Sequence, residues 1–300
     1  MSVAGLKYYL SSPANIFDFF AGRNMLNWMP DEAFLKRKFK LVMGYELDLE
    51  DPKTFNEKLQ WLKLYDRKPL YTKLVDKYEV RKYIAEKIGE EYLVPLVGGP
   101  WNSPDEIDFT ALPDQFVLKC THDSGGVIIC KDKSAFDIPA AKAVLNKHLK
   151  RNFYWANREW PYKDVPPRII AEKYMEDETD ELRDFKVFCF NGTPRMMYIS
   201  RDAAADTTDF FDMDFNHLPI RMKDPNSAIL PAKPEGFEEM RRIASDLSEG
   251  IPHVRTDFYC VNGKIYFGEL TFYHNGGFTG IKPEEWNYKV GDWIKLPGKE

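Results

Sequence analysis

The 300-residue sequence contains few cysteines, and their spacing matches neither a metal site nor a redox centre. There is no Cys-x-x-Cys pair, and the runs around several of the cysteines are rich in strand-forming residues. We therefore expect reduced thiols, three of them in strands that face the core, and a cytoplasmic protein. The four residues are Cys120, Cys130, Cys189 and Cys260.

Long apolar runs are also missing. No stretch approaches the roughly 18 apolar residues of a transmembrane helix, and the N-terminus lacks a basic region followed by an apolar one. We therefore expect a protein that is neither secreted nor membrane-spanning. Residues 15–30 are nevertheless rich in apolar side chains, and they either pack on their own domain or contact a membrane surface or partner protein peripherally. Their shortage of basic residues favours packing.

An excess of positive charge is absent as well. The chain has 42 Lys and Arg against 47 Asp and Glu, so its formal net charge is −5. Nucleic-acid binding is usually accompanied by a basic surface, and we expect no nucleic-acid partner. Instead, hydrophobic residues make up 44% of the chain and aromatic residues 15%, which suffices for the core of one large or two modest domains.

The first 90 residues are expected to be helical. Thr54-Phe-Asn-Glu57 is a capping box and predicts a helix that begins there with one apolar face. A second helix is predicted from about residue 71 to residue 88. A short strand is predicted at 92–97, closed by Gly98-Gly99-Pro100.

Later segments alternate between strand and helix patterns. The helix at 138–149 is expected to bury Ile138, Ala141, Val144, Leu145 and Leu149. The order predicts an α+β protein with two lobes, each built on an antiparallel sheet. The helical region is expected at residues 1–90 and the two lobes at residues 91–175 and 176–300. The predicted elements are strands at 116–119 and 127–129, a helix at 138–149, a strand at 168–175, a hairpin of 185–190 with 196–200, a helix at 235–247 and a hairpin over 254–271.

A glycine-rich loop separates the strands at 116–119 and 127–129. Gly125 and Gly126 allow backbone N–H groups to converge on an anion, and Lys119 places a cation at the base of the loop. The pattern indicates a loop that covers phosphates. An ordinary exposed hairpin is the alternative.

In the last predicted hairpin, the strand register decides whether there is a site. A two-residue turn at Asn262-Gly263 would leave Asp257 and Glu269 on opposite faces. A three-residue loop with a bulge at the glycine would instead place Asp257 opposite Glu269 and Arg255 opposite Thr271.

Two carboxylates on one rung repel each other unless a cation lies between them. Mg²⁺ that also holds nucleotide phosphates is typically bound by one or two protein carboxylates. Asp257 and Glu269 in the second register are therefore candidate metal ligands, and Arg255 would stabilise charge on a transferring phosphoryl group. Four solvated side chains on an exposed sheet face are the alternative.

Taken in chain order, Lys119, the glycine loop, Glu172-Lys-Tyr-Met175 and the Arg255, Asp257 and Glu269 group resemble the ATP-grasp superfamily. More narrowly, the chain from about residue 30 to its end resembles the TupA-like ATP-grasp family, which is associated with bacterial surface polysaccharide clusters and sometimes labelled glycosyltransferase. This resemblance is carried by Asp51-Pro-Lys-Thr-Phe-Asn-Glu-Lys-Leu-Gln-Trp-Leu-Lys63 through Asp76-Lys-Tyr78, Asp184-Phe-Lys-Val-Phe-Cys-Phe-Asn-Gly192 and Gly268-Glu-Leu-Thr-Phe-Tyr273.

The resemblance implies that ATP lies between two antiparallel sheets. Lys119 would contact the α- and β-phosphates, Glu172 the adenine amino group, the backbone near Met175 the ring nitrogen, and Glu181 or Asp184 the ribose. The implied nucleotide-binding residues are Lys77, Lys119, Asp123, Ser124, Gly125, Gly126, Glu172, Lys173, Tyr174, Met175, Glu181 and Asp184.

For catalysis, the resemblance implies Mg²⁺ on Asp257 and Glu269, with Arg255 and Lys186 around the phosphates. Most ATP-grasp ligases have asparagine where this chain has Thr271, a poorer Mg²⁺ ligand, and Asn275 is the candidate substitute. The loop His274–Gly277 is a candidate acceptor site. The aromatic loop 152–162 either lines that site or covers the core, and His122 is either structural or a proton carrier.

The family therefore implies an ATP- and Mg²⁺-dependent ligase, in which a carboxylate forms an acylphosphate that an amine then displaces. Its substrates would be small molecules or saccharides, with a uronic acid and an amino acid suggested by the polysaccharide association. The alternatives are a small-molecule kinase, a glycosyltransferase and a non-catalytic nucleotide-binding protein. Against a glycosyltransferase, no Asp-x-Asp triplet falls at the end of a predicted strand apart from Asp212-Met-Asp214, which is expected to form a surface turn.

Overall fold

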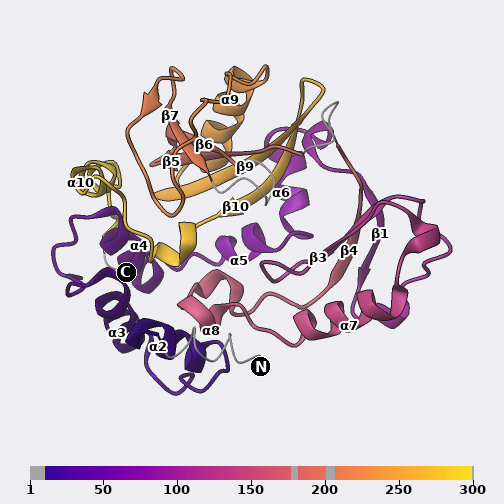
Figure 1. Ribbon diagram of the computed structural model, residues 1–300, viewed down its shortest axis with the longest axis horizontal. Coiled ribbons are helices and arrows are strands. Elements are labelled where there is room, and N and C mark those ends of the chain that lie inside the picture. Colours follow the sequence, from indigo (N-terminus) through magenta and orange to yellow (C-terminus); the bar gives the residue numbers. More distant parts are fainter. Residues whose placement is uncertain (1–10, 177–181, 201–206, 299–300) are drawn as a thin grey trace.

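Two antiparallel sheets, one in each of two lobes, form the framework of the protein (Figure 1). The computed structural model describes residues 11–176, 182–200 and 207–298. The smaller sheet has the strand order β1-β4-β2-β3, with β1 (Leu96–Trp101), β2 (Phe116–Cys120), β3 (Val127–Cys130) and β4 (Ile169–Lys173). The larger sheet has the order β10-β9-β5-β6-β7-β8, with β5 (Asp184–Phe190), β6 (Thr193–Ser200), β7 (Thr208–Asp212), β8 (His217–Leu218), β9 (His253–Val261) and β10 (Lys264–Thr271).

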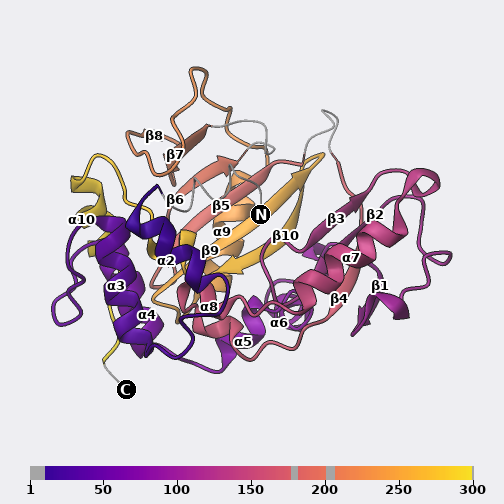
Figure 2. The ribbon, with the colours of Figure 1, turned by 60° about the horizontal axis from the view of Figure 1, so that its bottom comes forward.

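Helices cover the sheets and fill the space between them. Figure 2 shows α2, α3 and α4 together at one end of the molecule, beside the larger sheet, with α5 and α6 between the lobes. In the smaller lobe α7 packs on β2, and in the larger lobe α9 packs on β5, β6 and β9. The helices are α2 (Pro13–Ala21), α3 (Asp31–Met43), α4 (Phe55–Tyr65), α5 (Leu70–Val75), α6 (Val80–Lys87), α7 (Ile138–Leu149), α8 (Tyr154–Asn157), α9 (Phe237–Ser248) and α10 (Glu285–Asp292), with 3₁₀ turns η1 (Glu90–Tyr92), η2 (Pro104–Glu106), η3 (Lys133–Ala135), η4 (Trp160–Tyr162) and η5 (His274–Gly277).

The N-terminal helices share one hydrophobic core with the larger sheet, whereas the smaller sheet has a core of its own. The predicted capping box is present: Thr54 accepts from the backbone N–H of Glu57, and α4 follows. Phe55 at its start lies 6.5 Å from Phe188 of β5, centroid to centroid. Residues 1–90 therefore pack, as far as they are described, as part of the larger lobe.

The predicted helix over residues 71–88 is wrong as a single helix, because the chain breaks between α5 and α6. The Asp76 side chain accepts from the backbone N–H groups of Tyr78 and Glu79, at 2.8 and 3.4 Å. The Lys77 N–H donates to the carbonyl of Thr121 in the glycine loop, at 3.1 Å. These bonds replace intrahelical ones, since Asp side chains compete for nearby backbone N–H groups. The break carries Lys77 toward the other lobe.

Two further predictions need correction. The strand predicted at 92–97 begins instead at Leu96, so that Gly98, Gly99 and Pro100 lie inside β1 and the pairing with β4 is irregular there. In α7, Ala141 and Leu145 are buried as predicted, but Ile138 and Val144 are exposed. The buried face of α7 is therefore narrower than the spacing of its apolar residues predicted.

The last hairpin combines features of both predicted registers. Val261 pairs with Lys264 across a two-residue turn, in which Asn262 and Gly263 both have positive φ. A bulge between Phe267 and Glu269 then shifts the register by one residue. Asp257 consequently lies opposite Glu269 and Arg255 opposite Thr271, as the second register predicted. The predicted bulge at the turn is wrong, because Gly268 supplies the extra residue in mid-strand.

Gly268 suits this bulge because the other strand approaches it closely. A Cβ atom there would lie 3.1 Å from the carbonyl oxygen of Asp257. Within the last hairpin, the glycine therefore permits the two carboxylates to share a rung.

The apolar N-terminal segment is only partly buried. Phe17 packs at a tilt against Phe34 of the core, with ring centroids 5.0 Å apart, while Trp28 remains 75% exposed. Over residues 11–176, 182–200 and 207–298, no helix is both long enough and apolar enough to cross a bilayer. Cys120, Cys130 and Cys189 are buried in strands, as predicted for three of the four cysteines.

The close packing of α10 on the start of α4 generates a stability prediction. A Cβ at Gly291 would lie 2.2 Å from the carbonyl oxygen of Lys53 and 2.8 Å from the carbonyl carbon of Thr54, both backbone atoms that side-chain rotation cannot move. Gly291→Ala should lower the free energy of unfolding by about 3 kcal/mol, the upper range for overpacking. Urea denaturation followed by circular dichroism measures this change.

Gly298→Ala is the matched control, because a Cβ there would meet no atom within 4 Å. Equal midpoints for the two variants would contradict the proposed contact.

Candidate functional site

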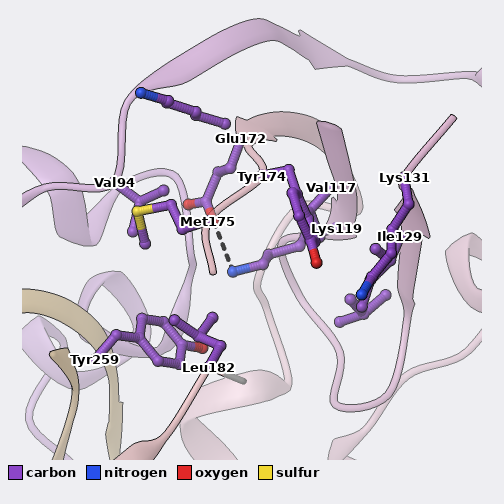
Figure 3. Close-up of a pocket in the computed structure, with 12 residues that line it drawn as sticks. Val94, Val117, Lys119, Ile129, Lys131, Glu172, Tyr174, Met175, Leu182 and Tyr259 are labelled. Carbon is purple, nitrogen blue, oxygen red and sulfur yellow. Dashed lines mark ion pairs between the residues drawn. The ribbon is translucent and has the colours of Figure 1, made fainter. Parts of the chain in front are cut away.

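A cavity of about 190 Å³ opens between the smaller sheet and β9 (Figure 3). Its walls are largely apolar, and the Lys119 ammonium and the Glu172 carboxylate lie within it. Tyr259 of β9 faces them from the larger lobe in Figure 3. The lining residues are Val94, Val117, Lys119, Val127, Ile129, Lys131, Glu172, Lys173, Tyr174, Met175, Leu182 and Tyr259.

Lys119 and Glu172 form the main ion pair of this cavity. Their side chains project from the adjacent strands β2 and β4, and the Lys119 Nζ lies 2.6 Å from the Glu172 Oε2. Arg81 of α6 approaches the other carboxylate oxygen at 3.6 Å. Burial disfavours the Lys119 ammonium, but Glu172 and Tyr259 outweigh that effect and raise its pKa. Glu172 therefore faces two cations, and Arg81, which the sequence reasoning missed, is one of them.

The glycine loop presents only its tip to solvent. Ser124 and Gly125 are exposed, and Gly125 has a φ of +88°, with no atom within 4 Å of the place that a Cβ would occupy. Gly126 is buried, and a Cβ there would lie 2.9 Å from the Cβ of Cys120. A side chain at either glycine would be strained or would clash, which agrees with a loop that must bring its backbone close to a neighbour.

Asp123 anchors the loop from beneath. Its carboxylate is buried and lies 2.5 Å from Nδ1 of His148 in α7, with Arg151 at 3.5 Å. Lys77 donates to the Asp123 carbonyl at 2.9 Å. The Asp123 side chain thus faces α7, and it also accepts from the Ser124 N–H at 2.8 Å, while the tip of the loop at Ser124 and Gly125 remains exposed. Nε2 of His122 lies 3.1 Å from the carbonyl of His148, a structural contact.

The carboxylate of Asp257 is shared by two cations. Arg255 donates to it through Nε at 2.7 Å and through Nη2 at 2.6 Å, and Lys186 through Nζ at 2.9 Å. Lys186 also pairs with Asp184 at the start of β5. Burial opposes the charged form of Lys186, but Asp257 and Asp184 together raise its pKa. The fully buried Asp257 is therefore held in one orientation.

Glu269 is held much more loosely. Its side chain is 40% exposed, and its oxygens lie 3.6 Å from Arg255 Nη2 and 3.8 Å from Lys77 Nζ. Burial acts to raise its pKa, yet Lys77 and Arg255 outweigh burial and lower it. Lys77, only 16% exposed, thus belongs to the site and not to a solvated helix face.

The residues present fit a Mg²⁺ ion that is completed by phosphate oxygens. Glu269 offers an ionised carboxylate with no short hydrogen bond to a cation, and Asp257 lies opposite it on the same rung. Thr271 instead accepts from Arg255 at 3.0 Å, while the exposed Asn275 lies against His274. Among the described residues, no group of three or more His, Cys, Asp or Glu side chains could hold a metal. One or two carboxylates suffice when phosphates supply further ligands.

Helix α4 supports the last loop of the site. Asn56 and Gln60 donate to the carbonyl of Gly277, at 3.0 and 2.9 Å, and Lys63 donates to that of Gly276 at 2.6 Å. His274 in the same loop accepts from Arg255 at 2.6 Å through Nδ1. Burial and the nearby Arg255 lower the pKa of His274 well below its usual value, so it acts as a neutral acceptor. The motif beginning at Asp51 thereby positions a loop more than 200 residues away.

A second cavity, of about 220 Å³, adjoins Arg255 and Glu269 of the last hairpin. The aromatic loop contributes Phe153 and Tyr162 to its wall, while Tyr154 of the same loop is buried. The loop thus lines a cavity and also covers the core. The lining residues are Ser124, Phe153, Asn157, Glu159, Tyr162, Arg255, Glu269, Thr271, Tyr273, Asn275 and Gly276.

Most of the predicted site residues converge on these two cavities. A smaller cavity lined by Lys77, Lys119, Glu172 and Gly268 lies between the ion pair and the hairpin. Asp184 pairs with Lys186. Glu181 lies outside the described residues. The sequence reasoning missed Glu159 and Tyr259 as site residues. For Glu159 a signal was available, because two adjacent charged residues, Arg158 and Glu159, inside an aromatic run indicate buried charge.

Several solved structures are similar to parts of this chain. D-alanine–D-alanine ligase from Helicobacter pylori matches with a TM-score of 0.47 and 13% identity over 81% of this chain and 69% of its own. An L-amino acid ligase from Bacillus licheniformis matches with a TM-score of 0.46 and 12% identity over 83% of this chain and 57% of its own. D-alanine–D-alanine ligase from Bacillus anthracis matches with a TM-score of 0.41 and 17% identity over 73% of this chain and 59% of its own. The chain thus spans less than two thirds of the length of the latter two proteins.

No curated protein matches the chain significantly. The model of one protein family, described as TupA-like ATPgrasp, matches residues 57–295 and so includes both sheets, the glycine loop and the hairpin carboxylates. With two antiparallel sheets in the arrangement that the resemblance implied, the chain belongs to the TupA-like ATP-grasp family.

Proposed function

We propose that this protein is an ATP- and Mg²⁺-dependent carboxylate–amine ligase that forms ADP and acts through an acylphosphate. The observation that carries the proposal is the convergence of Lys77 and Glu269, which are far apart in the chain, beside the cavity that holds Lys119. Cations and a half-exposed carboxylate at one junction suit a metal-bound triphosphate. Membership of the ATP-grasp family supports the same assignment.

In this proposal the cavity of Figure 3 receives the nucleotide base between its apolar walls. Lys173, Tyr174 and Met175 would border the adenine, and Lys119 the inner phosphates. The exposed tip of the glycine loop, Ser124 and Gly125, would cover the phosphates. Mg²⁺, held by Glu269 and Asp257, would neutralise the charge that develops on the transferring group.

The chain's own residues would then position two substrates. The donor carboxylate attacks the γ-phosphorus, the bond to the bridging oxygen of ADP breaks, and an acylphosphate results. Arg255 and Lys186 stabilise the negative charge on the transferring phosphoryl group. The amine then attacks the acyl carbon, and phosphate leaves. The glycine loop excludes water, which would otherwise hydrolyse the acylphosphate.

For the substrates we propose a uronic acid or related sugar acid of a surface polysaccharide and an amino acid or other amine. This assignment rests on the association of the family with polysaccharide clusters. The use of ATP and the free, buried thiols of Cys120, Cys130 and Cys189 favour a reaction in the cytoplasm. The triplet Asp212-Met-Asp214 offers no sugar-donor site, because Asp212 accepts from the N–H groups of Asp214 and Asn216 within its own turn.

Release of ADP from ATP and Mg²⁺ tests the proposal. Purified protein should release ADP only when pooled sugar acids and pooled amines are both present, because the acylphosphate needs both partners to turn over. Coupled ADP detection followed by mass spectrometry of the products measures this. A stable phosphorylated product without an amide would indicate a kinase, and binding of a UDP-sugar without any use of ATP would contradict the ligase assignment.

The two hairpin carboxylates should differ in their effect on stability. Glu269→Gln should abolish turnover yet change the free energy of unfolding by no more than about 0.5 kcal/mol, because its side chain is 40% exposed. Asp257→Asn should also abolish turnover, and additionally destabilise the fold by about 3–5 kcal/mol, since Arg255 and Lys186 would lose their buried counter-charge. Urea unfolding and ADP release distinguish the two effects. Equal stability of both variants would contradict the described role of Asp257.

Removal of Lys119 should weaken nucleotide binding. In Lys119→Ala the affinity for Mg²⁺–ATP should fall by at least about tenfold, or about 1.4 kcal/mol, because the cation of the cavity is lost. Isothermal titration calorimetry measures the affinity. Lys142→Ala, which removes an exposed ion pair to Asp105, is the control and should bind normally. An unchanged affinity in Lys119→Ala would argue against its place on the phosphates.

A further inference from the structure

The cavity beside the hairpin carboxylates contains a buried anion that no step above uses. Glu159, between α8 and η4, is 4% exposed, yet it is one of the residues that line this cavity of about 220 Å³. Tyr162 and Tyr273 line the same cavity, as do Arg255 and Glu269 on the side of the metal site. Glu159 thus lines the same cavity as Arg255 and Glu269 of the last hairpin.

Few groups of the protein satisfy this carboxylate. Within the described residues, its one hydrogen bond comes from Nδ2 of Asn157 to Oε1, at 3.2 Å. No cationic side chain of the described ranges lies within ion-pair distance of it. Burial therefore raises the pKa of Glu159, against the weaker opposing effect of Lys63.

Lys63, the nearest buried cation, has its hydrogen bonds elsewhere. Its Nζ donates to Oε1 of Gln60 and to the carbonyls of Asn157 and Gly276, at 2.9, 2.9 and 2.6 Å. These three acceptors use all three N–H groups of an ammonium. Lys63 consequently interacts with Glu159 only through long-range electrostatic attraction and donates no hydrogen bond to it.

We propose that Glu159 binds the ammonium group of the amine substrate in this cavity. A buried carboxylate with one weak donor is completed by a cation that brings its own N–H groups. Arg255 is the one cationic side chain among the described residues that line the cavity, and Asp257 already engages it. The site therefore favours a primary ammonium with a polar body that Asn157 and Asn275 can contact, such as an amino sugar, an amino alcohol or an amino acid.

This inference rests on the proposed ligase function and adds a proton path to it. The bound ammonium cannot attack, because its nitrogen lacks a lone pair. Glu159 accepts one N–H proton, the freed lone pair forms the C–N bond at the acyl carbon, and the C–O bond to phosphate breaks. The second amine proton passes to the departing phosphate as the amide forms. A carboxylate whose pKa is raised by burial suits this exchange.

Direct binding of a matched pair of probes tests the site. D-glucamine and D-sorbitol differ by one ammonium in place of one hydroxyl, and D-glucamine is protonated at pH 7.5. Saturation-transfer NMR with the wild-type protein should give at least about tenfold tighter binding of D-glucamine than of D-sorbitol, equivalent to about 1.4 kcal/mol. Equal binding of the two, or no binding of D-glucamine, overturns the proposal.

Variants assign that preference to Glu159. Glu159→Gln should lose the preference for D-glucamine, and Glu159→Asp, which keeps the charge but withdraws it, should retain part of it. Glu249→Gln is the matched control, because Glu249 is 75% exposed and pairs with Lys87. A preference that survives in Glu159→Gln overturns the assignment. If that variant does not fold, loss of part of the preference in Glu159→Asp supports it and an undiminished preference overturns it.

A second assay separates this inference from the ligase function. Hydroxylamine is largely unprotonated at pH 7.5 and needs no base before it attacks an acylphosphate. With a sugar-acid pool, Glu159→Gln should release ADP with hydroxylamine at a rate within about threefold of wild type, but at least about a hundredfold more slowly with D-glucamine. Equal losses with both amines overturn the proton path. If wild type releases no ADP with either amine, the ligase proposal fails, and the NMR preference still decides whether Glu159 holds an ammonium.

Discussion

The structure of the site depends on the compensation of buried charge around Asp257. Its carboxylate is almost fully buried and would be costly to ionise alone, but Arg255 and Lys186 donate three hydrogen bonds to it. The three side chains come from the adjacent strands β9 and β5, where Lys186 lies opposite Asp257. Because each charge stabilises the others, Arg255 remains oriented toward the cavity and its Nη1 can also bond His274.

From this cluster, support extends outward through backbone carbonyls. The loop that carries His274 is held by Asn56, Gln60 and Lys63 of α4, whose other face packs in the core of the larger lobe. A helix near the N-terminus thereby determines the shape of the cavity at the C-terminal loop. These buried side chains act on the site by holding the backbone of another segment in place. Their residue types alone do not indicate this role.

The two lobes meet where the chain breaks between α5 and α6. Lys77 at that break donates to the glycine loop of the smaller lobe and lies near Glu269 of the larger one. The isolated bridge between Leu93 and Phe267 joins the lobes close to the same point. The junction is thus built from single residues of four segments. A nucleotide bound there would contact both sheets at once, and its phosphates would replace some of the present ion pairs.

Local patterns of the sequence determined much of this protein. The capping box at Thr54, the strands on either side of the glycine loop and the helix over 138–149 follow from hydrogen-bonding and periodicity within a few residues. Tertiary contacts decided the rest. The bulge at Gly268, the break at Asp76 and the burial of Glu159 each depend on atoms far away in the chain. A short window of sequence cannot contain those partners, because only the packed fold brings them within hydrogen-bonding distance.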